Sequence, residues 1–340
     1  MIRYPVTSEG YDDTDFSQYG AEFLHSLLFK MLRIRRIEEK IESRYHEDEM
    51  KSPIHLVIGQ EASSVGSCAA LSDTDLIYST HRTHGNYLAK GGDLKAMMSE
   101  LYCRANGCVG SRGGSMHLLD KSVGMAGSSA IVGGIVPIAT GTALSAKIRR
   151  SDMVTGVYFG DGAVEEGSIW ESLNFAALKK LPVIYFCENN FYSVCTPLDK
   201  RQPEGVKIYK KAEAFGLRSE QIDGTNVLSV YESTKRAVSL VRAGNGPMFI
   251  EMLAYRWRGH GGAGDDSHTG YRDVAEGAQW HQFCPIETYK SALLGAGLLR
   301  ESLVDDMEHV IADEIDMAFE HAINSPNPTE ADLASFLYSE

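Results

Sequence analysis

The chain contains 340 residues, of which 43% are hydrophobic and 23% charged, a composition typical of a soluble globular protein. Its formal net charge of −13 at pH 7 argues against nucleic acid and anionic membranes as main partners. No apolar run is long enough to cross a bilayer. The amino terminus is polar and acidic, unlike a secretory signal or an arginine-rich transit peptide, and the six cysteines form no CxxC pair. We therefore expect a cytoplasmic protein with reduced thiols.

Residues 1–19 are expected to form a flexible arm. From Gly20 to about Glu47, apolar side chains recur at helical spacing, which predicts one long helix with a buried stripe. Three arginines interrupt this pattern, and we interpret them as a solvated face: Arg33, Arg35 and Arg36. The following segment, 55–71, is rich in small residues and is predicted to be buried.

A short strand near Asp75 should carry His81 and Arg82 at its end. Arginine is suited to phosphate because it presents paired donors. His81 and His84 are spaced to share a metal on one helical turn. However, no third ligand follows at a spacing typical of zinc sites, so we do not predict one. The glycine-rich stretch 107–134 is expected to press against a ligand or another subunit, or to form a mobile loop.

The stretch 154–192 is the most informative part of the chain. An apolar run ends in Gly160-Asp161-Gly162, a helix-like segment follows, and a second apolar run from Val183 ends in Glu188-Asn189-Asn190. Two such strands joined through a helix should be parallel, with a right-handed crossover. Asp161 and Asn190 would then follow neighbouring strand ends, where open α/β sheets bind ligands.

These two side chains offer hard oxygen donors, which suit Mg²⁺ held together with a phosphate. Asn190 follows Asp161 by 29 positions, and each residue closes an apolar strand. An ordinary strand–helix–strand unit with polar turns is the structural alternative.

After Tyr192, a polar stretch with two prolines is predicted to be a surface loop. A short edge strand within 212–224 and a helix from about 226 to 243 should follow. The apolar run 247–256 leads directly to His260 and a glycine-rich acidic loop, where an imidazole could exchange protons near neutral pH. From Pro285 on, two amphipathic helices are predicted.

Six segments in the same order resemble the alpha subunit of thiamine-diphosphate-dependent 2-oxo acid dehydrogenases, the family of pyruvate, branched-chain 2-oxo acid and acetoin dehydrogenases. They are HLVIGQEA, HRTHGNYLAKG, RGGSMH, GDGAVEEG, NFAALKKLPVIYFCENNFYS and YRWRGH. The resemblance extends from about Phe23 to Pro285. It implies an α/β thiamine-diphosphate-binding fold over residues 20–285, a mostly parallel sheet flanked by helices with an N-terminal helical extension. A C-terminal helical extension of the same domain should follow over 286–340.

The resemblance also assigns roles by position. The metal ligands for Mg²⁺ would be Asp161, Asn190 and the Tyr192 carbonyl. Cofactor contacts would come from His81 (where the family usually has Tyr), Arg82, Ala130, Val132, Asp161, Gly162, Ala163, Asn190, Tyr192 and His260. His260 would be the active-site histidine, and Arg256 would orient its loop.

In this family the glutamate that activates the cofactor comes from a separate beta subunit, and Glu61 should not be mistaken for it. We therefore expect half an active site, a heterotetramer of two alpha and two beta subunits, and decarboxylation of a small 2-oxo acid with acyl transfer to a lipoyl-bearing acyltransferase. One alternative is a carboligase or acetoin-type subunit that transfers the decarboxylated unit to an aldehyde or ketone. Another is a non-catalytic nucleotide-binding regulatory module.

Three residues depart from the family pattern, and two of them bear on the substrate. Pro53 stands where pyruvate-specific relatives tend to carry Phe, and Arg258 replaces a histidine that many relatives have. Both put pyruvate in doubt. Gly261 occupies the place of a regulatory serine in mitochondrial relatives, so we expect no such phosphorylation switch.

Overall fold

The computed structural model describes residues 3, 4, 8 and 10–335. Its centre is a parallel sheet of six strands in the order β2-β1-β3-β4-β8-β7, and a two-stranded antiparallel ribbon, β5-β6, lies beside it. The strands are β1 (Leu76–Ser79), β2 (Met125–Ser128), β3 (Thr155–Gly160), β4 (Val183–Asn189), β5 (Tyr192–Ser193), β6 (Thr196–Pro197), β7 (Arg218–Asp223) and β8 (Met248–Leu253). The predicted α/β fold with a mostly parallel sheet is confirmed.

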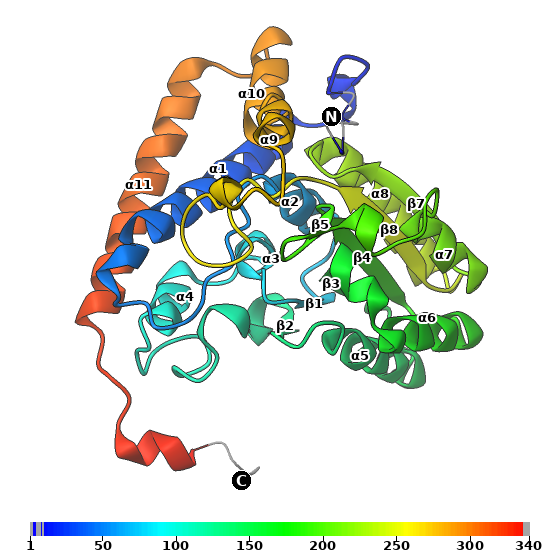
Figure 1. Ribbon diagram of the computed structural model, residues 1–340, viewed down its shortest axis with the longest axis horizontal. Helices are drawn as coiled ribbons and strands as arrows, with labels where there is room; N and C mark the ends of the chain where they lie inside the picture. Colours follow the sequence, from blue (N-terminus) through cyan, green and yellow to red (C-terminus); the bar gives the residue numbers. More distant parts are fainter. Residues whose placement is uncertain (1–2, 5–7, 9, 336–340) are drawn as a thin grey trace.

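Helices cover both faces of the sheet. They are α1 (Ala21–Arg44), α2 (Glu61–Ala69), α3 (His84–Lys90), α4 (Leu94–Leu101), α5 (Ile135–Arg149), α6 (Gly167–Lys179), α7 (Ile208–Ala214), α8 (Val227–Arg242), α9 (Val274–His281), α10 (Pro285–Gly295) and α11 (Glu301–Asn324). Figure 1 shows α5 and α6 on one side of the sheet and α2 and α8 on the other, with α1, α10 and α11 stacked outside α2.

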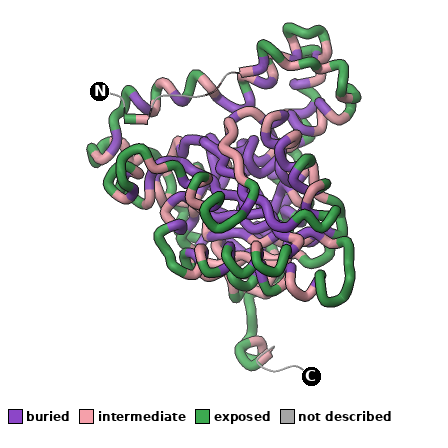
Figure 2. Tube along the Cα trace, turned by 90° about the vertical axis from the view of Figure 1, so that its right-hand side faces the viewer, coloured by how far each residue is buried: buried purple, intermediate pink, exposed green. Residues whose placement is uncertain are grey.

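The two central strands show why the sheet forms here. All seven residues of β4 are buried, and side chains alternate between the two hydrophobic cores. Tyr158 and Phe186 face the core under α1, α2 and α8, whereas Phe159 and Tyr185 face the core under α5 and α6. Figure 2 shows the buried residues gathered in this centre. Continuous apolar strands of this kind need both faces covered, as a parallel sheet provides.

The register of β3 and β4 fixes the position of the site. The two strands are parallel neighbours, and Gly160 pairs with Glu188. Their carboxyl ends therefore lie side by side, as predicted, and Asp161 and Asn190 follow them directly. However, α6 begins only at Gly167, because residues Asp161–Glu165 form a 3₁₀ turn. The first turn after β3 is therefore not part of α6.

The arginines of α1 are not simply a solvated face. Arg35 is buried and donates to Glu61 at the start of α2, with Nε 2.5 Å from Oε1. Arg33 and Arg36 reach across to glutamates of α11. Because α1 and α11 pack side by side, the charges between them join two helices that are far apart in the chain.

The described part of the segment 1–19 contacts the domain. The backbone amides of Arg3 and Tyr4 donate to Glu276 of α9, and Tyr11 is buried against Tyr289. At the other end, α10 and α11 match the two amphipathic helices predicted from Pro285 on. None of the described helices combines the length and apolar content required to cross a membrane.

Candidate active site

A cavity of about 210 Å³ opens at the carboxyl edge of the sheet, beyond the ends of β1, β3 and β4. All ten residues predicted to contact the cofactor line it: His81, Arg82, Ala130, Val132, Asp161, Gly162, Ala163, Asn190, Tyr192 and His260. Arg256, the remaining predicted residue, does not line the cavity. His55, Gln60 and Glu188 also line it, and sequence reasoning did not single them out.

Oxygen donors gather at one end of this cavity. The Asp161 carboxylate accepts from the Asn190 backbone amide at 3.3 Å, and the Asn190 side-chain amide donates to Gln60 Oε1 at 3.0 Å. That hydrogen bond orients the Asn190 carbonyl oxygen away from Gln60, and the Tyr192 amide lies 3.3 Å from it. Burial raises the pKa of Asp161, so the carboxylate is in an environment that favours a cationic partner.

Arg201 supplies a cation at this end. Its guanidinium donates to Asp161, and it also donates to Glu165 at 2.7 Å. Only 7% of the Arg201 side chain is exposed, so the interpretation of this stretch as a surface loop is wrong at Arg201. The sequence contains no local signal for this contact, because the loop follows β6 and returns to the end of β3 only in the folded chain.

A close approach explains Gly162. A Cβ atom added there would lie 2.8 Å from the Ser193 Cβ, a separation that side chains do not tolerate. The neighbouring turn is itself strained, because Phe191 and Val194 have positive φ values of 69° and 53° on either side of Tyr192. The structure therefore holds the Tyr192 backbone in a fixed and unusual turn beside Gly162.

Buried charge without a close ionic partner marks the middle of the cavity. Arg82 is buried and donates to the Leu56 and His260 carbonyl oxygens. Burial lowers its pKa to about 9. Burial also raises the pKa of Glu188 to about 7, and the positive charge of Arg82 opposes that shift. Among the described residues, no carboxylate forms a salt bridge with Arg82, so its charge is available to an anionic ligand.

Three histidines form the opposite wall. The His55 and His81 ring centroids are 4.6 Å apart, and His260 lies 5.1 Å and 5.4 Å from them. Burial, together with Arg82, lowers their pKa values to about 2 for His55, about 4 for His81 and about 3 for His260. All three imidazoles are therefore neutral near pH 7.

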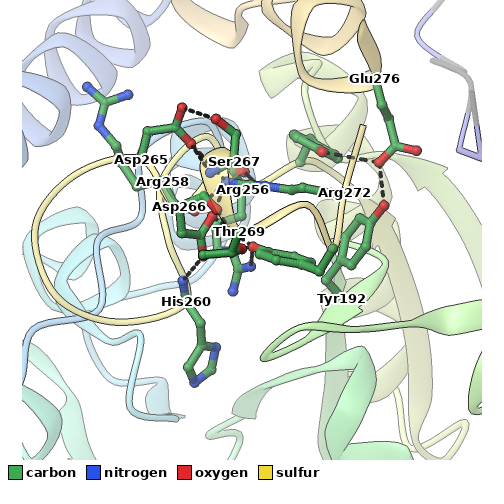
Figure 3. A network of polar contacts seen from close by, with 12 residues as sticks. Tyr192, Arg256, Arg258, His260, Asp265, Asp266, Ser267, Thr269, Arg272 and Glu276 are labelled. Carbon is green, nitrogen blue, oxygen red and sulfur yellow. Dashed lines mark hydrogen bonds and ion pairs between the residues drawn. The ribbon is translucent and has the colours of Figure 1, made fainter. Parts of the chain in front are cut away.

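A polar network fixes the loop that carries His260 (Figure 3). Asp266 accepts from the His260 backbone amide at 3.3 Å, and from Tyr271 and Arg272 at 2.9 Å. Arg256 donates to Tyr271 at 2.6 Å, and Arg272 donates back to the Arg256 carbonyl oxygen at 2.6 Å. Arg256 therefore contacts the loop that carries His260 and does not line the cavity.

A second anchor holds the backbone near the cavity. The Tyr192 hydroxyl donates to Glu276 at 2.7 Å, and Tyr255 donates to the same carboxylate at 3.1 Å. On the other side, His117 accepts from the Ala130 amide at 3.2 Å, and its second ring nitrogen lies 3.0 Å from the Gly113 carbonyl oxygen. The glycine-rich stretch therefore forms part of the cavity wall and is not simply a mobile loop.

The donor set fits an anionic phosphorylated cofactor with a divalent ion. Buried carboxylate and amide oxygens lie at one end, and a buried arginine without a salt bridge lies beside them. Among the described residues, several buried nitrogens near the cavity lack a hydrogen-bond partner: His55 Nδ1, Gln60 Nε2, and Arg256 Nε and Nη1. Unpaired buried donors of this kind indicate a site that is completed by a ligand.

Comparison with known proteins adds independent findings. The family model described as dehydrogenase E1 component matches residues 29–331. Subunit alpha-3 of the chloroplastic pyruvate dehydrogenase E1 component of Arabidopsis thaliana is 37% identical over 316 residues, covering 91% of this chain and 73% of the relative. The alpha subunit of acetoin:2,6-dichlorophenolindophenol oxidoreductase of Bacillus subtilis is 36% identical over 310 residues, covering 91% of each. The subunit of that name in Cupriavidus necator is 34% identical, covering 98% and 99%.

Proposed function

The chain belongs to the dehydrogenase E1 component family, as an alpha subunit of a thiamine-diphosphate-dependent 2-oxo acid dehydrogenase, and we propose that it decarboxylates a small 2-oxo acid together with a beta subunit. The observation that carries this proposal is the convergence of all ten predicted cofactor residues on one cavity at the carboxyl edge of the sheet.

In the proposed site, Asp161, Asn190 and the Tyr192 carbonyl would hold Mg²⁺ together with the diphosphate. Hard oxygen donors and a buried carboxylate support this part of the proposal. Arg82 neutralises the anionic group, since it is a buried cation without a salt bridge to a described carboxylate. Thiamine diphosphate held by these residues would supply the nucleophile for the substrate carbonyl and the electron sink for loss of CO₂.

His260 exchanges the proton. Its ring lines the cavity and is neutral near pH 7, so the ring nitrogen that carries no proton can accept one from the substrate side and return it. Asp266, Arg272 and Arg256 hold the loop in place, which keeps the imidazole at a constant position during turnover.

An exposed apolar surface beside the cavity supports the need for a beta subunit. Ile131 is 73% exposed, Val132 48% and Ile138 56%, and all three lie on or just before α5. We propose that a beta subunit covers this surface and completes the site, in an assembly of two alpha and two beta subunits. A lipoyl-bearing acyltransferase as acceptor, and the cytoplasm as location, remain parts of the same proposal.

Native mass spectrometry of the chain purified from its own cells tests this function. We expect a complex with a second subunit of similar size that retains thiamine diphosphate and Mg²⁺. The variant Asp161→Asn should lose Mg²⁺-dependent cofactor binding, whereas Asp199→Asn on the exposed loop should keep it. A homo-oligomer that fails to bind the cofactor with added Mg²⁺ would instead favour the regulatory-module alternative.

Acetoin chemistry is the second candidate. The acetoin relatives align over nearly their whole length, and Pro53 and Arg258 depart from the pattern of pyruvate-specific relatives. The reconstituted complex should be assayed with acetoin and with pyruvate, with and without a lipoyl acceptor. Turnover of acetoin without a lipoyl partner would favour this second candidate.

A further inference from the structure

The three histidines of the cavity wall converge from separate parts of the chain. His55 precedes α2, His81 follows β1, and His260 lies on the loop after β8. One ring nitrogen from each can be chosen so that the three atoms all lie within 4.8 Å of one another. Figure 3 shows the His260 ring directed away from the network that holds its backbone, so the ring itself is not used by that network.

The ring nitrogens of these histidines are not engaged in the protein. Among the described residues, no hydrogen bond is formed by the His55, His81 or His260 rings, and His55 Nδ1 is buried without a partner. By contrast, both ring nitrogens of the buried His84 have partners, Glu38 at 2.6 Å and Ser115 at 2.7 Å. His84 shows how this protein buries a histidine for packing, with both ring nitrogens hydrogen-bonded. The rings of the three cavity histidines form no such bonds with described residues, and each retains a free lone pair.

We propose that His55, His81 and His260 form a nitrogen-donor metal site, which binds one borderline divalent ion of the Zn²⁺ class. Zinc–nitrogen bonds are about 2.0–2.1 Å long, so the three donors of a tetrahedral site lie about 3.3 Å apart. The three side chains are partly exposed, and their donor atoms, within 4.8 Å of one another, must come closer by side-chain rotation to reach this geometry. The fourth position faces the cavity and is open to water or to a carboxylate.

The chemistry of the donors selects the metal. Neutral imidazoles suit Zn²⁺, Co²⁺ and Cu²⁺, whereas Mg²⁺ requires oxygen ligands. Because the three pKa values are lowered, metal binding at pH 7 displaces no proton. Arg82 and Arg256 contribute positive potential at the site and weaken the binding of every cation. No described side chain orients the rings from behind, so we expect weaker binding than at a structural zinc site.

This site is distinct from the proposed Mg²⁺ ligands, Asp161 and Asn190, which offer oxygen. Its consequence for activity rests on the proposed function of His260. A metal on the His260 ring takes the lone pair that would accept the proton, so the ion acts as a reversible inhibitor. Binding of the metal does not depend on that role.

The experiment uses the complex with its beta subunit, saturated with thiamine diphosphate and Mg²⁺, and titrates it with ZnCl₂ or CoCl₂. We expect one ion per alpha chain by calorimetry and elemental analysis. The Co²⁺ spectrum should show tetrahedral bands without the thiolate charge-transfer band that a cysteine site gives. His55→Gln and His81→Phe should each weaken binding at least about 10-fold, as the loss of one strong ligand bond predicts.

His309→Gln on the exposed face of α11 is the matched control and should leave metal affinity unchanged. Retained binding in both cavity variants, with thermal unfolding like that of the parent, would overturn the proposal, as would the absence of binding in the parent. If the ion binds as described but turnover is unaffected, the metal site stands and the role of His260 in the proposed function fails.

Discussion

Two buried arginines in different regions of the molecule differ in whether a carboxylate balances their charge. Arg35, between α1 and α2, donates to the buried carboxylate of Glu61 at 2.5 Å, and this interaction raises its pKa against the opposing effect of burial. Arg82, at the cavity, has only carbonyl oxygens as partners, and burial lowers its pKa to about 9. One arginine is balanced by the protein itself, and the other is not.

This difference distinguishes a region whose buried charges stabilise the fold from a region whose buried polar groups are available to a ligand. In the helical region, buried charges are paired within the chain, so removing one partner should affect stability. At the cavity, Gln60 Nε2 and His55 Nδ1 are buried without a partner among the described residues and Arg82 has no salt bridge with a described carboxylate, at a cost in stability that only a ligand offsets. Substitutions in the first region should therefore change folding, and substitutions in the second should change binding or turnover.

The largest effect is expected for His260→Ala. Loss of a general acid–base group reduces turnover about 10²–10⁴-fold. Affinity for the cofactor should change little, because the metal ligands and Arg82 remain. Steady-state rates of the reconstituted complex, together with cofactor titration by fluorescence, measure both. Unchanged turnover would remove His260 from the mechanism, and a parallel loss of cofactor affinity would assign it a binding role.

Arg35→Met should be next in size. It leaves the Glu61 carboxylate buried without its cation, which costs about 3–5 kcal/mol of unfolding free energy. Arg33→Met is the matched control on the same helix, because its partner Glu314 is partly exposed and the pair contributes at most about 1 kcal/mol. Denaturant unfolding of the two variants gives the comparison. Equal losses would show that burial does not distinguish the two pairs.

The sequence predicts the sheet, the crossover helix and the ends of β3 and β4, because each depends on a local pattern of apolar and turn residues. It also places Asp161 and Asn190 together, since parallel neighbouring strands end at the same edge. His55, Arg201 and the Arg35–Glu61 pair were not predictable in this way. Each of these contacts joins segments through the folded chain, and an isolated histidine or arginine in a loop carries no sign of its partner.

Glu188→Gln tests the cavity through pH. The folded-state pKa of Glu188 is raised from 4.5 to about 7, so the neutral acid is favoured by folding. Its contribution to stability is complete below pH 4.5 and is lost as the pH rises through 7, an effect of at most about 3 kcal/mol. Relative to the parent, the variant without cofactor should gain stability between pH 5 and pH 8.

The exposed Glu171→Gln is the control for Glu188→Gln and should track the parent across this range. Unfolding midpoints in urea at several pH values measure the difference. A pH-independent difference between parent and Glu188→Gln would mean that Glu188 ionises normally in the folded chain.

Arg82→Met completes the comparison with Arg35→Met and should have the smallest effect on folding. Because Arg82 has no salt bridge with a described carboxylate, removing its charge also removes the cost of burying it, and the unfolding free energy should stay within about 1 kcal/mol of the parent. Affinity for the diphosphate should fall by about 1.5–3 kcal/mol, the contribution of a charged hydrogen bond. Calorimetry with thiamine diphosphate and Mg²⁺ measures this loss of affinity. Denaturant unfolding without cofactor measures the change in unfolding free energy. A large loss of stability with unchanged affinity would show that Arg82 is structural, and the contrast between the two arginines would then be wrong.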